Sequence, residues 1–172
     1  PRYQGAGSSQ VVPTTLDNAF ECIASKLDEQ GSVTFAKGYE PGKTELDQGL
    51  IQEAVDLARS ADAVVLFVGL PAIDESEGFD REHLGIPRQQ ELLINSVCKE
   101  NPNSVVVLSN GAPVTMPWVD APSAILEGYL LGQAGGAAVA DILFGKTNPS
   151  GKLAESFALE QQDIPSDNWF SG

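Results

Sequence analysis

One stretch, Ala63-Val64-Val65-Leu66-Phe67-Val68, decides the fold class because all six of its residues are apolar. A strand without polar alternation is expected where helices cover both faces of a sheet, and such sheets are built from parallel strands. Val105-Val106-Val107-Leu108 repeats the pattern. We therefore expect an α/β fold with three layers, in which helices lie on both faces of a mostly parallel sheet.

Helix and strand signals alternate on either side of these runs. Apolar residues at three- and four-residue spacing predict helices over 15–27, 45–61 and 86–100, and a fourth helix is expected around 137–144. Further strands are expected at 33–36 and 124–129, with an edge strand at 152–157. Thr15 is expected to cap the first helix, and Pro87 to open the third.

Length and composition describe one folded domain. The chain has 172 residues, of which 42% are hydrophobic and 20% charged, so it is long enough for one well-buried core. We expect residues 1–10 to be an incoming linker, 11–158 the domain, and 159–172 an outgoing tail towards a further domain. The tail contains Trp169 and Phe170 but has no helix or strand period.

Charge and hydropathy exclude some partners. The formal charge is −14, from 24 acidic and 10 basic residues, which argues against nucleic acid and anionic membranes because both need clustered Lys and Arg. No apolar run approaches the roughly 20 residues of a membrane helix, and the first residues do not have the pattern of a signal peptide. The cellular compartment stays open between periplasm, cytoplasm and the outside of the cell.

An acidic loop follows the first apolar strand. Four carboxylates and one arginine lie within the eight residues from Asp74 to Arg81. Open α/β sheets carry their chemistry in loops at the carboxyl ends of their strands, so this loop is the candidate site. The alternative is a solvated acidic loop on an acidic protein.

Metal, redox and cofactor chemistry have little support. Cys22 and Cys98 occupy apolar positions of predicted helices, and His83 has no second imidazole beside it, so neither a zinc site nor a disulfide framework is indicated. Gly135-Gly136 opens a predicted helix without the spacing of a phosphate-binding motif. A free-standing nucleotide-binding domain is therefore an alternative for which the expected phosphate-binding motif is missing. Trp118 either fills the core or faces a bound ligand.

Several short motifs follow one another along the chain. They are, in order, Ser76-Glu77-Gly78-Phe79-Asp80-Arg81, Gly111-Ala112-Pro113-Val114, Pro117-Trp118, Gly132-Gln133-Ala134-Gly135-Gly136, Ala140-Asp141-Ile142-Leu143-Phe144-Gly145 and Asn148-Pro149-Ser150-Gly151-Lys152-Leu153. This series resembles the second domain of family 3 glycoside hydrolases. The resemblance covers residues 5–165 and begins with a Gly/Ser-rich entry at 5–9. The resemblance implies an α/β sandwich of about six strands, preceded by an N-terminal (β/α)8 barrel that binds the sugar and supplies an aspartate nucleophile.

The resemblance also leads to roles for four residues of the acidic loop. Glu77 matches the general acid/base of a retaining exo-β-glycosidase, most simply a β-glucosidase, acting on a β-linked oligosaccharide or glycoside. Glu75 is its rival because loop lengths vary at this point. Asp80 and Arg81 are expected to brace the loop, Arg81 through a bidentate pair with a carboxylate, unless they form an ordinary surface ion pair. No cofactor or metal is implied.

The expected site is incomplete within this sequence. A retaining glycosidase uses two carboxyl groups about 5 Å apart, one as nucleophile and one as proton donor. No stretch here resembles the nucleophile motif of the family, and a barrel of roughly 250 residues does not fit in the chain. We therefore expect this domain alone to be inactive. The competing hypothesis is a non-catalytic carbohydrate-binding or assembly module.

Overall fold

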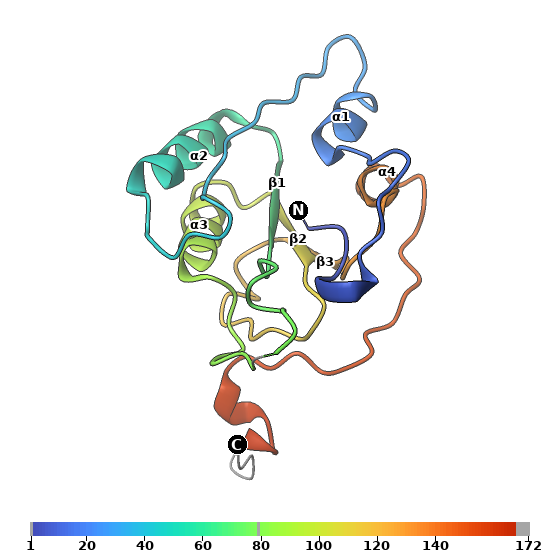
Figure 1. Ribbon diagram of the computed structural model, residues 1–172. Coiled ribbons are helices and arrows are strands. Elements are labelled where there is room, and N and C mark those ends of the chain that lie inside the picture. The colour runs from blue at the N-terminus through green and yellow to red at the C-terminus, as the bar shows by residue number, and fades with distance from the viewer. Residues whose placement is uncertain (1, 79, 168–172) are drawn as a thin grey trace.

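The computed structural model describes residues 2–78 and 80–167, and within them three strands form one parallel sheet (Figure 1). The strands are β1 (Val64–Gly69), β2 (Ser104–Ser109) and β3 (Ala124–Glu127), in that spatial order. The register places Gly69 opposite Ser109 and Leu108 opposite Glu127. All three carboxyl ends therefore lie at one edge of the sheet.

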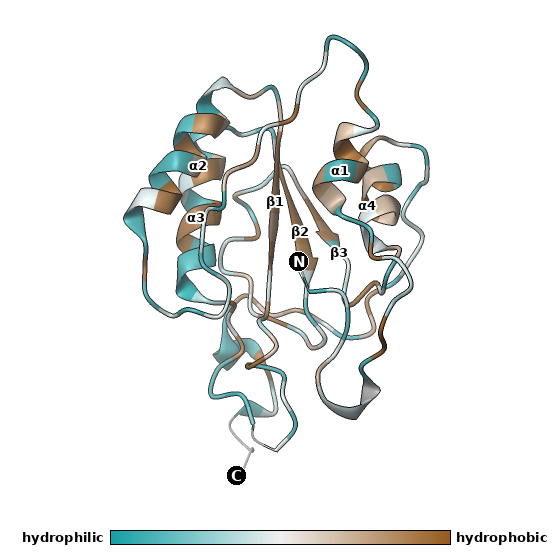
Figure 2. Cartoon of the chain, turned by 45° about the horizontal axis from the view of Figure 1, so that its top comes forward, coloured by the Kyte–Doolittle hydropathy of each residue, from teal (hydrophilic) through white to brown (hydrophobic). Residues whose placement is uncertain are grey.

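Helices cover both faces of the sheet, as the apolar strands predict. In Figures 1 and 2, α2 (Gln48–Ser60) and α3 (Arg88–Glu100) lie on one side of the strands, and α1 (Ala19–Ala24) and α4 (Gly135–Leu143) lie on the other. Two short 3-10 helices, η1 (Gly7–Ser9) and η2 (Gln161–Asp163), complete the described elements. The α/β class and the layer order are thus confirmed.

The main core lies between the sheet and α3. Ile94 and Val97 of α3 are buried against the same cluster as Val106 and Leu108 of β2. Cys98 and Trp118 belong to this cluster as well, so the interpretation of Trp118 as a core residue is confirmed. Cys22 is only partly buried, on α1.

The expectation of about six strands is wrong for the part of the chain that the structure describes. Neither 33–36 nor 152–157 forms a strand. Phe35 is 68% exposed and Leu153 is 55% exposed. A strand needs a neighbouring strand to pair with, and although Phe157 packs against the core, neither segment pairs with a strand in the described part of the chain.

The first helix is shorter than its periodicity predicts. It begins at Ala19, and its N-cap is Asn18, whose side chain accepts a hydrogen bond from the Phe20 N–H at 2.9 Å. Thr15 is therefore not the cap. The physical reason lies just upstream, where the Asp17 N–H donates to the Gln133 carbonyl at 2.9 Å and so keeps this part of the chain on the loop before α4.

Gly69 determines where the chain leaves the sheet. A Cβ added there would lie 2.0 Å from the Ser109 carbonyl oxygen, and the residue has φ 151°. Its N–H donates to Gln90 Oε1 at 2.7 Å, and the Leu70 N–H donates to the Ser109 carbonyl at 3.2 Å. This close approach sets the starting point of the acidic loop.

No helix within residues 2–78 and 80–167 has the length and apolar character needed to cross a membrane. Phe79 of the acidic motif, and Trp169 and Phe170 of the tail, lie outside the described residues. The linker and tail boundaries stay predictions.

Candidate active-site loops

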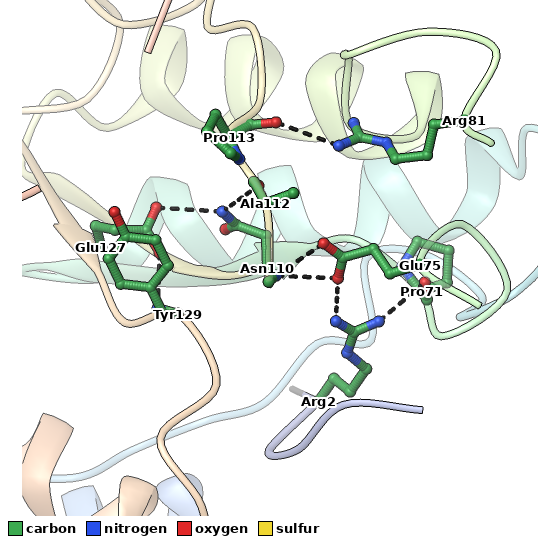
Figure 3. Close-up of polar contacts among 10 residues, drawn as sticks. Arg2, Pro71, Glu75, Arg81, Asn110, Ala112, Pro113, Glu127 and Tyr129 are labelled. Atoms are coloured by element: carbon green, nitrogen blue, oxygen red, sulfur yellow. Dashed lines mark hydrogen bonds and ion pairs between the residues drawn. The ribbon is translucent and has the colours of Figure 1, made fainter. Parts of the chain in front are cut away.

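Three loops meet at the carboxyl edge of the sheet: 70–87 after β1, 110–123 after β2 and 128–134 after β3. The N-terminal segment 2–10 lies against two of them, since Arg2 contacts Glu75 and the Gly132 N–H donates to the Tyr3 carbonyl at 2.8 Å. Figure 3 shows the polar contacts that join these loops. Polar groups from four separate parts of the sequence therefore gather at this edge.

The Glu75 carboxylate accepts hydrogen bonds from one loop and forms an ion pair with the N-terminal segment. The Gly111 N–H donates to both carboxylate oxygens, at 2.9 and 3.0 Å, and the Arg2 guanidinium forms an ion pair with Oε2 (Figure 3). The Glu75 side chain is 11% exposed and that of Arg2 14%. Because each of these partners is a donor, Glu75 serves them as an acceptor carboxylate. This arrangement suits a residue that braces the loop.

Glu77 is placed differently, although it lies only two residues further on. It is exposed, and within the described residues no hydrogen bond or ion pair engages its carboxylate. Its carboxyl group lies against the backbone of Gly7, where an added Cβ would be 2.9 Å from Glu77 Cδ and 3.0 Å from Oε1. Glu77 is thus an exposed residue whose carboxyl group has no donor in the part of the chain that the structure describes.

Arg81 braces a loop, but not through a carboxylate. Its Nη1 donates to the Pro113 carbonyl at 3.2 Å, which links loop 70–87 to loop 110–123. Within residues 2–78 and 80–167 it has no carboxylate at ion-pair distance, so the expected bidentate pair is not formed. Burial of the guanidinium lowers the pKa of Arg81, while the charges of Glu75 and Asp74 oppose that shift. Asp80 is exposed, and no hydrogen bond or ion pair engages its side chain among residues 2–78 and 80–167, so its bracing role stays a prediction.

Glu127, at the end of β3, is a carboxylate that the sequence analysis missed. The Tyr129 N–H donates to its Oε1 at 2.6 Å and Asn110 Nδ2 to its Oε2 at 3.5 Å. Burial raises the pKa of Glu127 to about 6, against the lowering effect of these two hydrogen bonds, and the charge of Glu75 adds a smaller upward shift. The available signal was a charged residue at the end of an otherwise apolar strand.

The two glycines at the start of α4 serve packing. A Cβ on Gly136 would lie 3.0 Å from the Asp17 carbonyl oxygen and 3.0 Å from the Ala19 nitrogen. The Asp17 carboxylate also accepts the Ala137 N–H at 3.4 Å, so the first turn of α4 already has an acceptor. These contacts support the packing role of the glycines over a phosphate site.

No group of three or more metal-ligating side chains occurs in the described ranges 2–78 and 80–167. His83 is exposed on the loop, and Cys98 is buried in the core. The carboxylates described at this edge are those of Glu75, Glu77 and Glu127.

Comparison of the sequence with known proteins finds one family model and relatives that are glycoside hydrolases. Residues 1–171 match the model of the glycosyl hydrolase family 3 C-terminal domain. Thermostable beta-glucosidase B of Acetivibrio thermocellus is 49% identical over 166 residues, covering 96% of this chain and 22% of the relative. An exo-alpha-(1->6)-L-arabinopyranosidase of Bifidobacterium breve is 46% identical over 172 residues, covering 98% of this chain and 22% of the relative.

A solved structure gives the same result. The crystal structure of the Bifidobacterium adolescentis GH3 beta-glucosidase superposes with a TM-score of 0.84 at 47% identity, over 96% of this chain and 24% of that chain. The present chain thus spans about a fifth to a quarter of the length of these proteins.

Proposed function

The chain belongs to glycoside hydrolase family 3, as its C-terminal domain, and from this premise we propose that it supplies the general acid/base to a retaining exo-β-glycosidase. A β-glucosidase is the simplest reading, because Acetivibrio and Bifidobacterium relatives have that name. The arabinopyranosidase relative leaves the sugar open. The substrate class is a β-linked oligosaccharide or glycoside.

The contrast between Glu75 and Glu77 is the observation that supports Glu77 as the proton donor. A proton donor needs a carboxyl group that can reach the glycosidic oxygen. Glu75 is occupied by Arg2 and by the Gly111 N–H, whereas Glu77 is exposed at the carboxyl edge of the sheet. The same loop thus provides one bracing glutamate and one reactive glutamate.

The proposed reaction divides between two parts of the protein. The protonated Glu77 gives its proton to the departing glycosidic oxygen while a second carboxylate, about 5 Å away, attacks the anomeric carbon. Glu77, then a carboxylate, takes a proton from the water that hydrolyses the glycosyl-enzyme. We assign the nucleophile to an N-terminal (β/α)8 barrel.

The test is Glu77→Ala in the full-length protein, with aryl glycosides of different leaving groups. We expect kcat/KM to fall by about 10²- to 10⁴-fold for poor leaving groups and much less for activated ones, which need no proton. Azide should partly restore turnover of an activated substrate and give a glycosyl azide of retained configuration. Glu82→Ala, an exposed neighbour on the loop, is the matched control.

Unchanged turnover of Glu77→Ala would contradict the assignment. Turnover that is lost equally for every leaving group, without azide rescue, would also count against proton transfer by Glu77. Unchanged turnover would favour either the rival donor Glu75 or the competing hypothesis, a non-catalytic carbohydrate-binding or assembly module.

A further inference from the structure

We propose that the N-terminal segment, residues 2–7, is a positioning device for the acid/base glutamate. Arg2 fixes the acidic loop through Glu75, and Gly7 provides the space in which the Glu77 carboxyl group lies. The inference rests on the proposed function of Glu77. It assigns positioning roles to two residues that are distant from the acidic loop in sequence.

Arg2 fixes the loop at two points. Its guanidinium forms the ion pair with Glu75, and Nη1 donates to the Pro71 carbonyl at 3.2 Å. The fork of the guanidinium thus joins the start of the loop to its middle, as Figure 3 shows. Charge-assisted contacts of a planar fork restrict geometry more than a single point charge does. Because Gly111 donates to the same carboxylate, Glu75 has little freedom to move.

The segment is itself fixed beyond Arg2. The Gly132 N–H donates to the Tyr3 carbonyl at 2.8 Å, which ties the segment to the loop after β3. The segment therefore contacts two of the three loops at the carboxyl edge. The contacts of Arg2 and Tyr3 therefore hold the segment in place at the candidate site.

Gly7 lies directly against the proposed proton donor. Its φ of +78° is in the left-handed region, and an added Cβ would be 2.9 Å from Glu77 Cδ, 3.0 Å from Oε1 and 3.2 Å from Oε2. A side chain here would displace the carboxyl group. Displacement of a reacting group by about 1 Å can cost on the order of 100-fold in rate, so a methyl group at this position should act on proton transfer.

The chain offers a matched control for backbone strain. Gly42 has φ +76°, almost the same as Gly7, but an added Cβ there would meet no atom within 4 Å. Gly42→Ala therefore reproduces the conformational cost of Gly7→Ala without the collision. A difference in kcat/KM between the two variants therefore reports the effect of the contact with Glu77.

The experiment compares Gly7→Ala, Gly42→Ala and Glu77→Ala in the full-length protein, using aryl glycosides whose leaving groups span several pKa units. For Gly7→Ala we expect kcat/KM to fall about 10- to 100-fold with poor leaving groups and less than about threefold with the most activated one. Gly42→Ala should match the wild type throughout. A uniform loss across all leaving groups in Gly7→Ala, or no loss, would overturn the role of Gly7.

Arg2 is tested in the same series with Arg2→Met and Arg2→Lys. Arg2→Met should lower kcat/KM most for poor leaving groups and so steepen the dependence of kcat/KM on leaving-group pKa. Arg2→Lys, which retains the charge without the planar guanidinium, should recover part of that lost kcat/KM. Equal rates for Arg2→Met and wild type would overturn the role of Arg2.

Glu77→Ala distinguishes a failure of the proposed function of Glu77 from a failure of the positioning role of Gly7. If it shows no dependence on the leaving group, the proposed function fails and the positioning role fails with it. If Glu77→Ala shows that dependence and Gly7→Ala does not, only the positioning role of Gly7 is wrong.

Discussion

At the scale of single residues, three glutamates at one sheet edge differ because their neighbours differ. Glu75 has two kinds of donor, Glu77 has none within the described residues, and Glu127 is partly buried with weak support from Asn110. Sequence spacing identifies the loop but does not separate Glu75 from Glu77. The separation depends on Arg2, which lies 73 positions from Glu75.

Glu127 should make stability depend on pH. Its pKa is raised from the ordinary 4.5 to about 6, mainly by burial. Well below pH 4.5 the group is neutral in both the folded and the unfolded state. Between about pH 4.5 and 6 it is ionised in the unfolded chain but still largely protonated in the folded protein, so rising pH favours unfolding. The free energy of unfolding should fall over this interval, by about 1 kcal/mol after solvent screening.

The measurement is urea unfolding of wild type and Glu127→Gln between pH 4 and 8. Other carboxylates titrate in the same range, so the quantity of interest is the difference between the two proteins. We expect that difference to shift in favour of Glu127→Gln as pH rises. Glu155→Gln, at an exposed position, should show no such shift. Parallel profiles for wild type and Glu127→Gln would refute the assignment.

At the scale of elements, continuous apolar runs predict strands better than alternating ones do. The residues of β1 and β2 are buried from both sides, so their sequence alone specifies a covered parallel strand. Segment 152–157 alternates and segment 33–36 is short, and strand formation in both depends on a partner strand that the sequence does not identify. The first helix shows the same limit, since the contact between Asp17 and Gln133 sets its start.

Gly69→Ala should be strongly destabilising, because the new methyl carbon would lie 2.0 Å from the Ser109 carbonyl oxygen and backbone atoms cannot move aside as a flexible side chain can. We expect a loss of at least about 2 kcal/mol in the free energy of unfolding, measured by urea denaturation. Gly151→Ala, where an added Cβ meets nothing within 4 Å, should change stability by less than about 0.5 kcal/mol. A similar loss in both variants would disprove the role of this close approach.

At the scale of the whole molecule, the sequence predicts which loops come together at the candidate site but not the contacts that hold those loops in place. Parallel strands bring the loops after β1, β2 and β3 to one edge, and that much follows from the apolar runs. The contacts of Arg2 and Gly7 with the acidic loop are long-range and have no local pattern. Arg81 illustrates the same point, because its partner is a backbone carbonyl, that of Pro113, and every residue has a backbone carbonyl.

The proposed division of the active site between this domain and an N-terminal barrel leads to a prediction about the polypeptide of residues 1–172 by itself. It contains the proposed proton donor but no segment that resembles the nucleophile motif, and without a nucleophile the two-carboxylate reaction cannot start. We expect it to unfold cooperatively on heating, since it has a continuous core around Ile94 and Val106, yet to hydrolyse 4-nitrophenyl glycosides no faster than buffer. The full-length protein under the same conditions is the positive control. Turnover by residues 1–172 that Glu77→Ala abolishes would place both carboxylates within this chain, and Asp74, Asp80 and Glu127 would then be the candidates for the nucleophile.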